Sequence, residues 1–77
     1  MPMERRTASE LSAIIMDRLQ AGPDRDTVER VVVTPSFGDG WTWEIVARRG
    51  AVVRDFAGME LAISELQRRY GLRAAAA

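Results

Sequence analysis

Hydrophobic and polar positions repeat with two different periods along the chain, and each period predicts a different kind of element. The first period is helical, and its apolar residues share one face: Leu11, Ile14, Ile15 and Leu19. Thr7 and Glu10 precede this face with the spacing of a capping box, so a helix should begin there. We expect Gly22 to end it in a left-handed conformation, because Pro23 follows and cannot continue a helix.

The middle of the chain has the two-residue period of β-strands. The β-branched segment 30–34, RVVVT, predicts a strand that ends at Pro35, and SFGDG at 36–40 supplies a turn. The next segment predicts a second strand with one buried face, because Trp41, Trp43, Ile45 and Ala47 alternate with Thr42, Glu44, Val46 and Arg48. Arg49 and Gly50 suit a tight turn, which would fold residues 51–55 back as a third strand.

A second amphipathic helix closes the chain. It should begin near Gly58, and its apolar face comprises Met59, Ala62, Ile63, Leu66 and Tyr70. Arg68 and Arg69 complement the negative end of the helix dipole, and Gly71 is expected in a left-handed conformation beyond them. Residues 73–77, RAAAA, are expected to form a frayed tail.

Together these elements predict an α+β fold with the order α-β-β-β-α. The antiparallel sheet would have three strands, or two if residues 51–55 do not pair. Such sheets commonly leave one face in solvent, so we expect both helices to pack on the other face. The length predicts a single domain over 1–77, with an ordered core over about 7–72.

Trp41 and Trp43 are two residues apart, so they should point the same way as Ile45. Burying an aromatic side chain removes 150 to 250 Å² from water, which is worth roughly 4 to 6 kcal/mol. A domain this small needs that contribution, so we interpret both tryptophans as core residues rather than as an exposed binding surface. Trp41, at the start of its strand, is the one expected nearer the rim.

The composition excludes most catalytic chemistry. The chain has no Cys, no His and no Lys, and therefore no thiolate, imidazole base or Schiff-base lysine. Gly38-Asp39-Gly40 leads into a strand, which is typical of a turn and not of a phosphate loop. The segment beginning at Asp24 lacks the later ligands of a calcium loop. We therefore expect no enzyme activity, no metal and no cofactor.

Charge and hydropathy bear on partners and location. Eleven arginines balance eleven acidic residues, so no overall field steers the protein towards nucleic acid or a membrane. No apolar run is long enough to span a bilayer, and the first ten residues lack the apolar part of a signal peptide. We expect a cytoplasmic protein.

Two surfaces are candidates for binding. The first is the open sheet face, with residues 30–34 as an edge that could pair with another chain, and it would bind a protein partner or a second copy. Its candidate residues are Arg30, Val32, Glu44, Val46 and Arg48. The alternative is a nucleic-acid site made by an arginine cluster. That cluster would comprise Arg48, Arg49, Arg54, Arg68 and Arg69.

Two family resemblances accompany these patterns. WTWEIVARRGAVVRDFAG resembles the central strands of double-stranded-RNA-binding domains, but Gly58 to Ala62 lacks the basic motif with which that family binds phosphate. VVVTPSFGDGWTWEI, Phe56 and ELAISEL are similar to small bacterial β-β-β-α domains of unknown function. Both resemblances imply a three-stranded sheet, and the second implies no particular activity.

Overall fold

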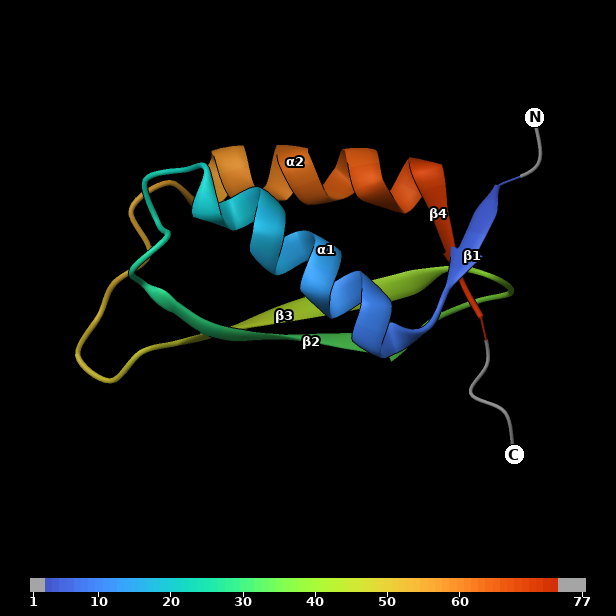
Figure 1. The fold of residues 1–77 in the computed structure, drawn as a ribbon, viewed down its shortest axis with the longest axis horizontal. Helices are drawn as coiled ribbons and strands as arrows, with labels where there is room; N and C mark the ends of the chain where they lie inside the picture. Colours follow the sequence, from blue (N-terminus) through green and yellow to red (C-terminus); the bar gives the residue numbers. More distant parts are fainter. Residues whose placement is uncertain (1–2, 74–77) are drawn as a thin grey trace.

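The structure, a computed structural model of the chain, describes residues 3–73 and contains two helices and two small sheets. Both helices lie on the same side of a long hairpin, and the second sheet lies at one end of the molecule (Figure 1). The elements, in chain order, are β1 (Glu4–Arg6), α1 (Ala8–Gln20), β2 (Val28–Pro35), β3 (Trp41–Ala47), α2 (Phe56–Arg69) and β4 (Tyr70–Leu72). The predicted α+β class is confirmed.

Helix α1 begins as its sequence predicts. The Thr7 hydroxyl accepts a hydrogen bond from the Glu10 N–H, and the Glu10 carboxylate accepts one from the Thr7 N–H. This second bond is the main reason why the pKa of Glu10 lies below its usual value. The capping box is therefore confirmed, and it fixes the boundary between β1 and α1.

The predicted left-handed glycines at the helix ends are wrong. Among the described residues only Gly38 and Gly50 have positive φ angles. The N–H groups of Ala21 and Gly22 still bond to carbonyls in the last turn of α1, so the chain leaves that helix without a left-handed residue. Gly71 is instead an extended residue of β4 and pairs with Arg5 of β1.

Strands β2 and β3 form the antiparallel hairpin that the alternation predicts. Val31 lies opposite Ile45, and the register continues to Pro35 opposite Trp41. Gly38, with a φ of 60°, provides the left-handed residue of the 36–40 turn. The hairpin therefore has the predicted turn and the predicted buried face.

The predicted third strand is wrong, and the hairpin sheet has two strands. Arg49 and Gly50 do occupy the centre of a tight turn, because the Ala51 N–H bonds to the Arg48 carbonyl at 2.9 Å. Only Gly50 has a positive φ, as in type II turns, and such turns splay the flanking strands instead of pairing them. Residues 51–55 consequently form a loop that leads to α2.

Asp24 holds this loop in place. Its carboxylate is buried and accepts hydrogen bonds from the N–H groups of Arg54 at 2.7 Å and Asp55 at 2.9 Å. Asp55 in turn accepts from the Gly58 N–H at 3.0 Å, so α2 begins at Phe56, two residues before the predicted start. The loop is therefore held by hydrogen bonds to one buried carboxylate and not by pairing with a strand.

The β1–β4 pair is an element that the sequence patterns miss. These short strands are parallel, and the Arg73 N–H extends the pairing by donating to the Arg6 carbonyl. The Leu72 N–H donates to the Asp39 carbonyl, so the second sheet is fastened to the hairpin turn. Arg73 was predicted to lie in a frayed tail and is instead bonded; residues 74–77 of that tail lie outside the described residues.

Trp41 belongs to the core, as predicted, and is the more buried of the two tryptophans. It is 4% exposed, whereas Trp43 is half-buried beside the core. The expected order of burial is therefore reversed, because β4 and α2 close over the start of β3. The other buried apolar residues are Leu11, Ile15, Leu19, Val28, Val31, Met59, Ile63 and Leu66.

Candidate interaction surface

Hydrogen-bonded and non-hydrogen-bonded residue pairs alternate along the hairpin, and this alternation determines which backbone groups are free to bind another strand. The Ser36 N–H bonds to the Gly40 carbonyl at 3.0 Å, so the next pair, Pro35 and Trp41, must be a non-hydrogen-bonded pair. Proline fits there because it has no N–H to donate. By alternation, the pairs Val33–Trp43 and Val31–Ile45 also direct their backbone groups away from the hairpin.

Two side chains support this assignment. The Ser12 hydroxyl donates to the Val31 carbonyl at 2.9 Å, and the Gln67 amide donates to the Trp41 carbonyl at 2.8 Å. Both carbonyls therefore point outwards from the hairpin. The core-facing residues of the two strands are thus also the residues with outward-pointing N–H and C=O groups.

The open face of the hairpin carries the other set of residues, and four of the five predicted partner-binding residues lie together on it. Arg30 is opposite Val46, and Val32 is opposite Glu44. Arg48 follows the end of β3, where its N–H closes the ladder by donating to the Thr27 carbonyl at 2.7 Å. The face is therefore one cross-strand cluster of four residues, with Arg48 at its border.

This open face combines charge and apolar surface. Arg30 and Glu44 are exposed, while Val32 and Val46 are half-buried. Neither charged group takes part in an ion pair within residues 3–73. Since both helices lie on the opposite side of the hairpin (Figure 1), no described helix covers this face.

The two edges of the hairpin differ. Residues 30–34 were predicted to be the pairing edge, but α1 packs along β2 and Ser12 occupies the Val31 carbonyl. On β3, Gln67 occupies only the Trp41 carbonyl. The outward groups of Trp43 and Ile45 receive no hydrogen bond from elsewhere in the described part of the chain. The accessible edge is therefore that of β3.

An aromatic pair borders this β3 edge. The rings of Trp43 and Phe56 are 5.8 Å apart at their centroids and are tilted by 33°. Phe56, the first residue of α2, is 52% exposed. The edge thus offers unpaired backbone groups and a partly exposed apolar surface side by side.

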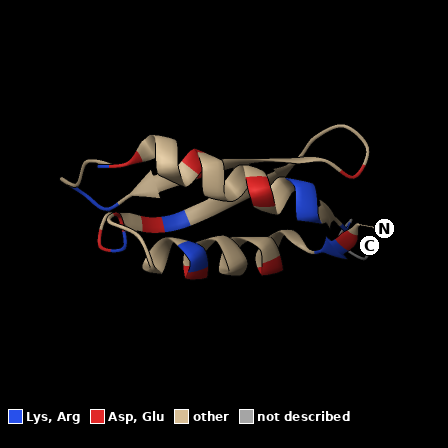
Figure 2. Cartoon of the chain, turned by 90° about the horizontal axis from the view of Figure 1, so that it is seen from above, with Lys and Arg blue, Asp and Glu red and all other residues tan. Residues whose placement is uncertain are grey.

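The predicted arginine cluster is divided between opposite ends of the molecule. Arg48, Arg49 and Arg54 lie around the loop that follows β3, whereas Arg68 and Arg69 end α2 beside β4 (Figure 1). Each helix also carries acidic residues, Glu10 and Asp17 in α1 and Glu60 and Glu65 in α2 (Figure 2). Phosphate binding depends on several neighbouring cations, so this arrangement does not form one nucleic-acid-binding face from the five residues.

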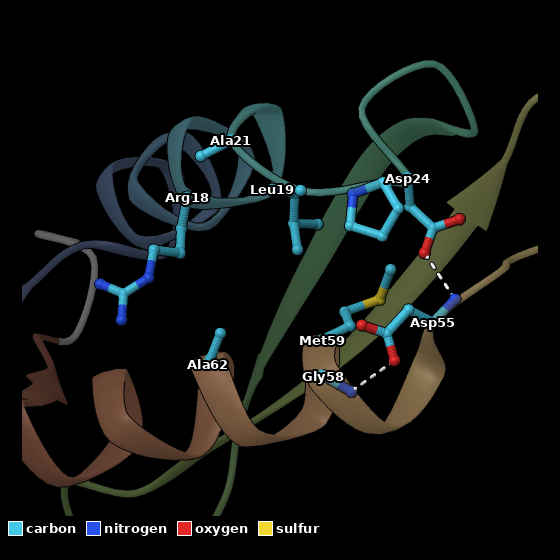
Figure 3. Close-up of a pocket in the computed structure, with 10 residues that line it drawn as sticks. Arg18, Leu19, Ala21, Asp24, Asp55, Gly58, Met59 and Ala62 are labelled. Atoms are coloured by element: carbon cyan, nitrogen blue, oxygen red, sulfur yellow. Dashed lines mark hydrogen bonds between the residues drawn. The ribbon is translucent and has the colours of Figure 1, made fainter.

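A groove lies between the end of α1 and the start of α2. Its volume is about 270 Å³, and Leu19, Met59 and Ala62 contribute to its walls (Figure 3). Asp24 and Asp55 lie at one end, where their carboxylates already accept backbone hydrogen bonds. The Arg54 N–H is the main cause of the lowered pKa of Asp24. These carboxylates hold the loop and the helix start.

Residues 3–73 contain no group of three or more acidic, His or Cys side chains that could hold a metal ion. None of their helices has both the length and the apolar character required to cross a membrane.

Comparison of the chain with models of known protein families, with curated proteins and with solved structures found no match. The resemblances to double-stranded-RNA-binding domains and to small bacterial β-β-β-α domains therefore stay predictions. The third strand that both imply is not formed by residues 51–55.

Proposed function

We propose that the protein is a non-enzymatic interaction module that forms a homodimer through the β2–β3 hairpin. The observation that carries this proposal is the unpartnered state of the hairpin within residues 3–73: no described helix covers its outer face, and β3 has free backbone groups. A two-stranded sheet has two edge strands, and the edge of β3 is the accessible one here. An exposed strand edge is also a ready template for pairing with another chain.

A second copy suits this surface because the surface is self-complementary. Arg30 and Glu44 are on the same face, and each lacks an ion-pair partner within the described residues. In a twofold symmetric contact, the same residues of both copies take part, so Arg30 of one copy can lie near Glu44 of the other. Val32 and Val46 provide apolar surface between the charges.

The absence of Cys, His and Lys from the sequence supports a binding role. Asp24 and Asp55, the two carboxylates beside the groove, already accept backbone N–H groups. Neither has a His, Cys or Lys to act with, because the chain contains none. Binding to another protein does not require His, Cys or Lys side chains.

Sedimentation equilibrium over a range of protein concentrations tests this function. We expect a reversible monomer–dimer equilibrium in the micromolar range, because a contact between short strands is smaller than the interfaces of tight dimers. Val46→Glu should shift the equilibrium to monomer by adding a second carboxylate beside Glu44 on the same face of β3. The matched control is Leu61→Glu on the exposed side of α2, 70% exposed, which should leave association unchanged. A native chain that stays monomeric at high micromolar concentration would contradict the proposal.

A further inference from the structure

We infer that the second copy pairs antiparallel along the β3 edge, with the twofold axis at Ile45. This inference rests on the proposed homodimer and adds its edge, register and symmetry. The result would be one four-stranded sheet with the order β2, β3, β3 of the second copy, β2 of the second copy. Four observations on the edge lead to this arrangement.

The first observation is the set of free backbone groups. Trp43 and Ile45 direct theirs outwards, as the hairpin phase requires. Ala47 continues the series, because the register irregularity between Val28 and Arg30 leaves the following residue, Arg48, bonded to Thr27. Three alternate residues of β3 are therefore ready to exchange hydrogen bonds with another strand.

The second observation is that the edge is closed at one end. The Gln67 amide occupies the Trp41 carbonyl, and α2 lies beside that part of the hairpin. A second strand can therefore pair along residues 43–47 and not beyond. The midpoint of that segment is Ile45, and a twofold axis there uses all three free residues on each copy.

The third observation concerns charge. An axis at Glu44 would place that carboxylate opposite its own copy, and like charges directly opposite each other are destabilising. An axis at Ile45 places Glu44 opposite Val46 of the second copy. Arg30 lies in the same row, and one strand separates it from the opposing Glu44. The two Glu44 carboxylates then lie on a diagonal and not directly opposite each other.

The fourth observation concerns side-chain size on the core-facing side. The axis at Ile45 places Trp43 opposite Ala47 of the second copy, which pairs a large side chain with a small one. Phe56 packs against Trp43 and is half exposed next to the edge. The second copy would cover this aromatic surface as well as the backbone groups.

Disulfide trapping tests the register, because the chain has no cysteine and any disulfide must then join two copies. Glu44→Cys and Val46→Cys are prepared as separate single variants, mixed and oxidised at a concentration where the native chain is dimeric. In the inferred register these positions form a non-hydrogen-bonded pair with Cα atoms about 4.5 Å apart, a separation that a disulfide can span. Glu60→Cys on the exposed side of α2 measures background cross-linking.

We expect the mixed disulfide, which joins one Glu44→Cys chain to one Val46→Cys chain, to exceed the share that random pairing would produce. The disulfides formed by each single variant with itself should stay at the Glu60→Cys background.

A dominant Glu44→Cys homodisulfide would overturn the register. Random cross-linking from a chain that sediments as a dimer would overturn the β3 edge while the proposed function stands. A native chain that sediments only as monomer would overturn both. Near-native tryptophan fluorescence of each variant confirms that it is folded.

Discussion

The indole N–H of Trp41 donates to the backbone carbonyl of Tyr70 at 3.0 Å. This bond joins the start of β3 to the start of β4, two segments that are distant in the sequence. Gln67 bonds to the Trp41 carbonyl from the same end of α2, so both the ring and the backbone of Trp41 are held. Trp41 is thus a core residue that also fastens the second sheet to the hairpin.

Replacing Trp41 with Phe should therefore destabilise the protein more than the same change at Trp43. Trp41→Phe removes the indole N–H and leaves the Tyr70 carbonyl without this donor, which costs about 1–3 kcal/mol in addition to lost packing. The Trp43 side chain makes no hydrogen bond within residues 3–73, so Trp43→Phe serves as the control. Urea unfolding followed by circular dichroism measures both changes. Equal losses would show that the Tyr70 bond contributes nothing.

Asp24→Asn should destabilise the loop that replaces the third strand. The two carboxylate oxygens accept from the N–H groups of Arg54 and Asp55, and an asparagine can offer only one oxygen. The control, Asp26→Asn, changes a carboxylate that is solvent-exposed. We expect a lower unfolding midpoint for Asp24→Asn alone, and faster hydrogen exchange at the amides of residues 54 and 55. Unchanged exchange at both amides would contradict this role.

The Asp24 carboxylate also makes the free energy of unfolding depend on pH. The pKa values of Asp24 and Glu10 are lowered in the folded state from ordinary values of 3.8 and 4.5. The unfolded chain therefore binds more protons as the pH falls, and the stabilisation present above pH 4.5 is lost as the pH passes down through the folded pKa values. Urea unfolding between neutral pH and about pH 3 should show this decline. Asp24→Asn should make the slope shallower, and an unchanged slope would exclude Asp24 as a source.

Helices and the hairpin follow from local chemistry that the sequence displays. Thr7 and Glu10 form the predicted capping box, and residues 41–45 alternate in burial as their pattern requires. Even the phase of the hairpin was implicit, because Pro35 has no N–H and must occupy a non-hydrogen-bonded position once the 36–40 turn is known. The open face of the hairpin was predicted from the alternation of residues along the second strand.

The remaining features depend on contacts between distant residues or on backbone angles that the sequence does not specify. All three residues of Glu4–Arg6 are charged, so no alternation of apolar and polar residues predicts β1. This strand forms because it pairs with Tyr70–Leu72. The Arg49–Gly50 turn was recognised, but its hand, which prevents a third strand, depends on the φ of Arg49. The sequence does not distinguish Asp24 from the other charged residues of its connector, because the N–H groups that it accepts from belong to Arg54 and Asp55, far along the chain.

Reversing one charge on the open face should weaken the dimer, and reversing both should restore it. Arg30→Glu or Glu44→Arg would place like charges in one row of the four-stranded sheet, and the effect occurs twice by symmetry. We expect the dimer Kd to rise roughly tenfold in each single variant and to return towards the native value in the double variant. Thr42→Arg, exposed on the same face outside the paired segment, is the control. A double variant as weak as the two single changes combined would exclude the ion pair.

The most direct measurement of the β3 edge is residue-resolved amide hydrogen exchange at low and high protein concentration. In the inferred dimer the N–H groups of Trp43, Ile45 and Ala47 gain partners, so their exchange should slow as the dimer forms. The amides of Glu44 and Val46 bond within the hairpin in either state and should show little change. Exchange at Trp43, Ile45 and Ala47 that is independent of concentration, in a chain that sediments as a dimer, would contradict pairing along β3.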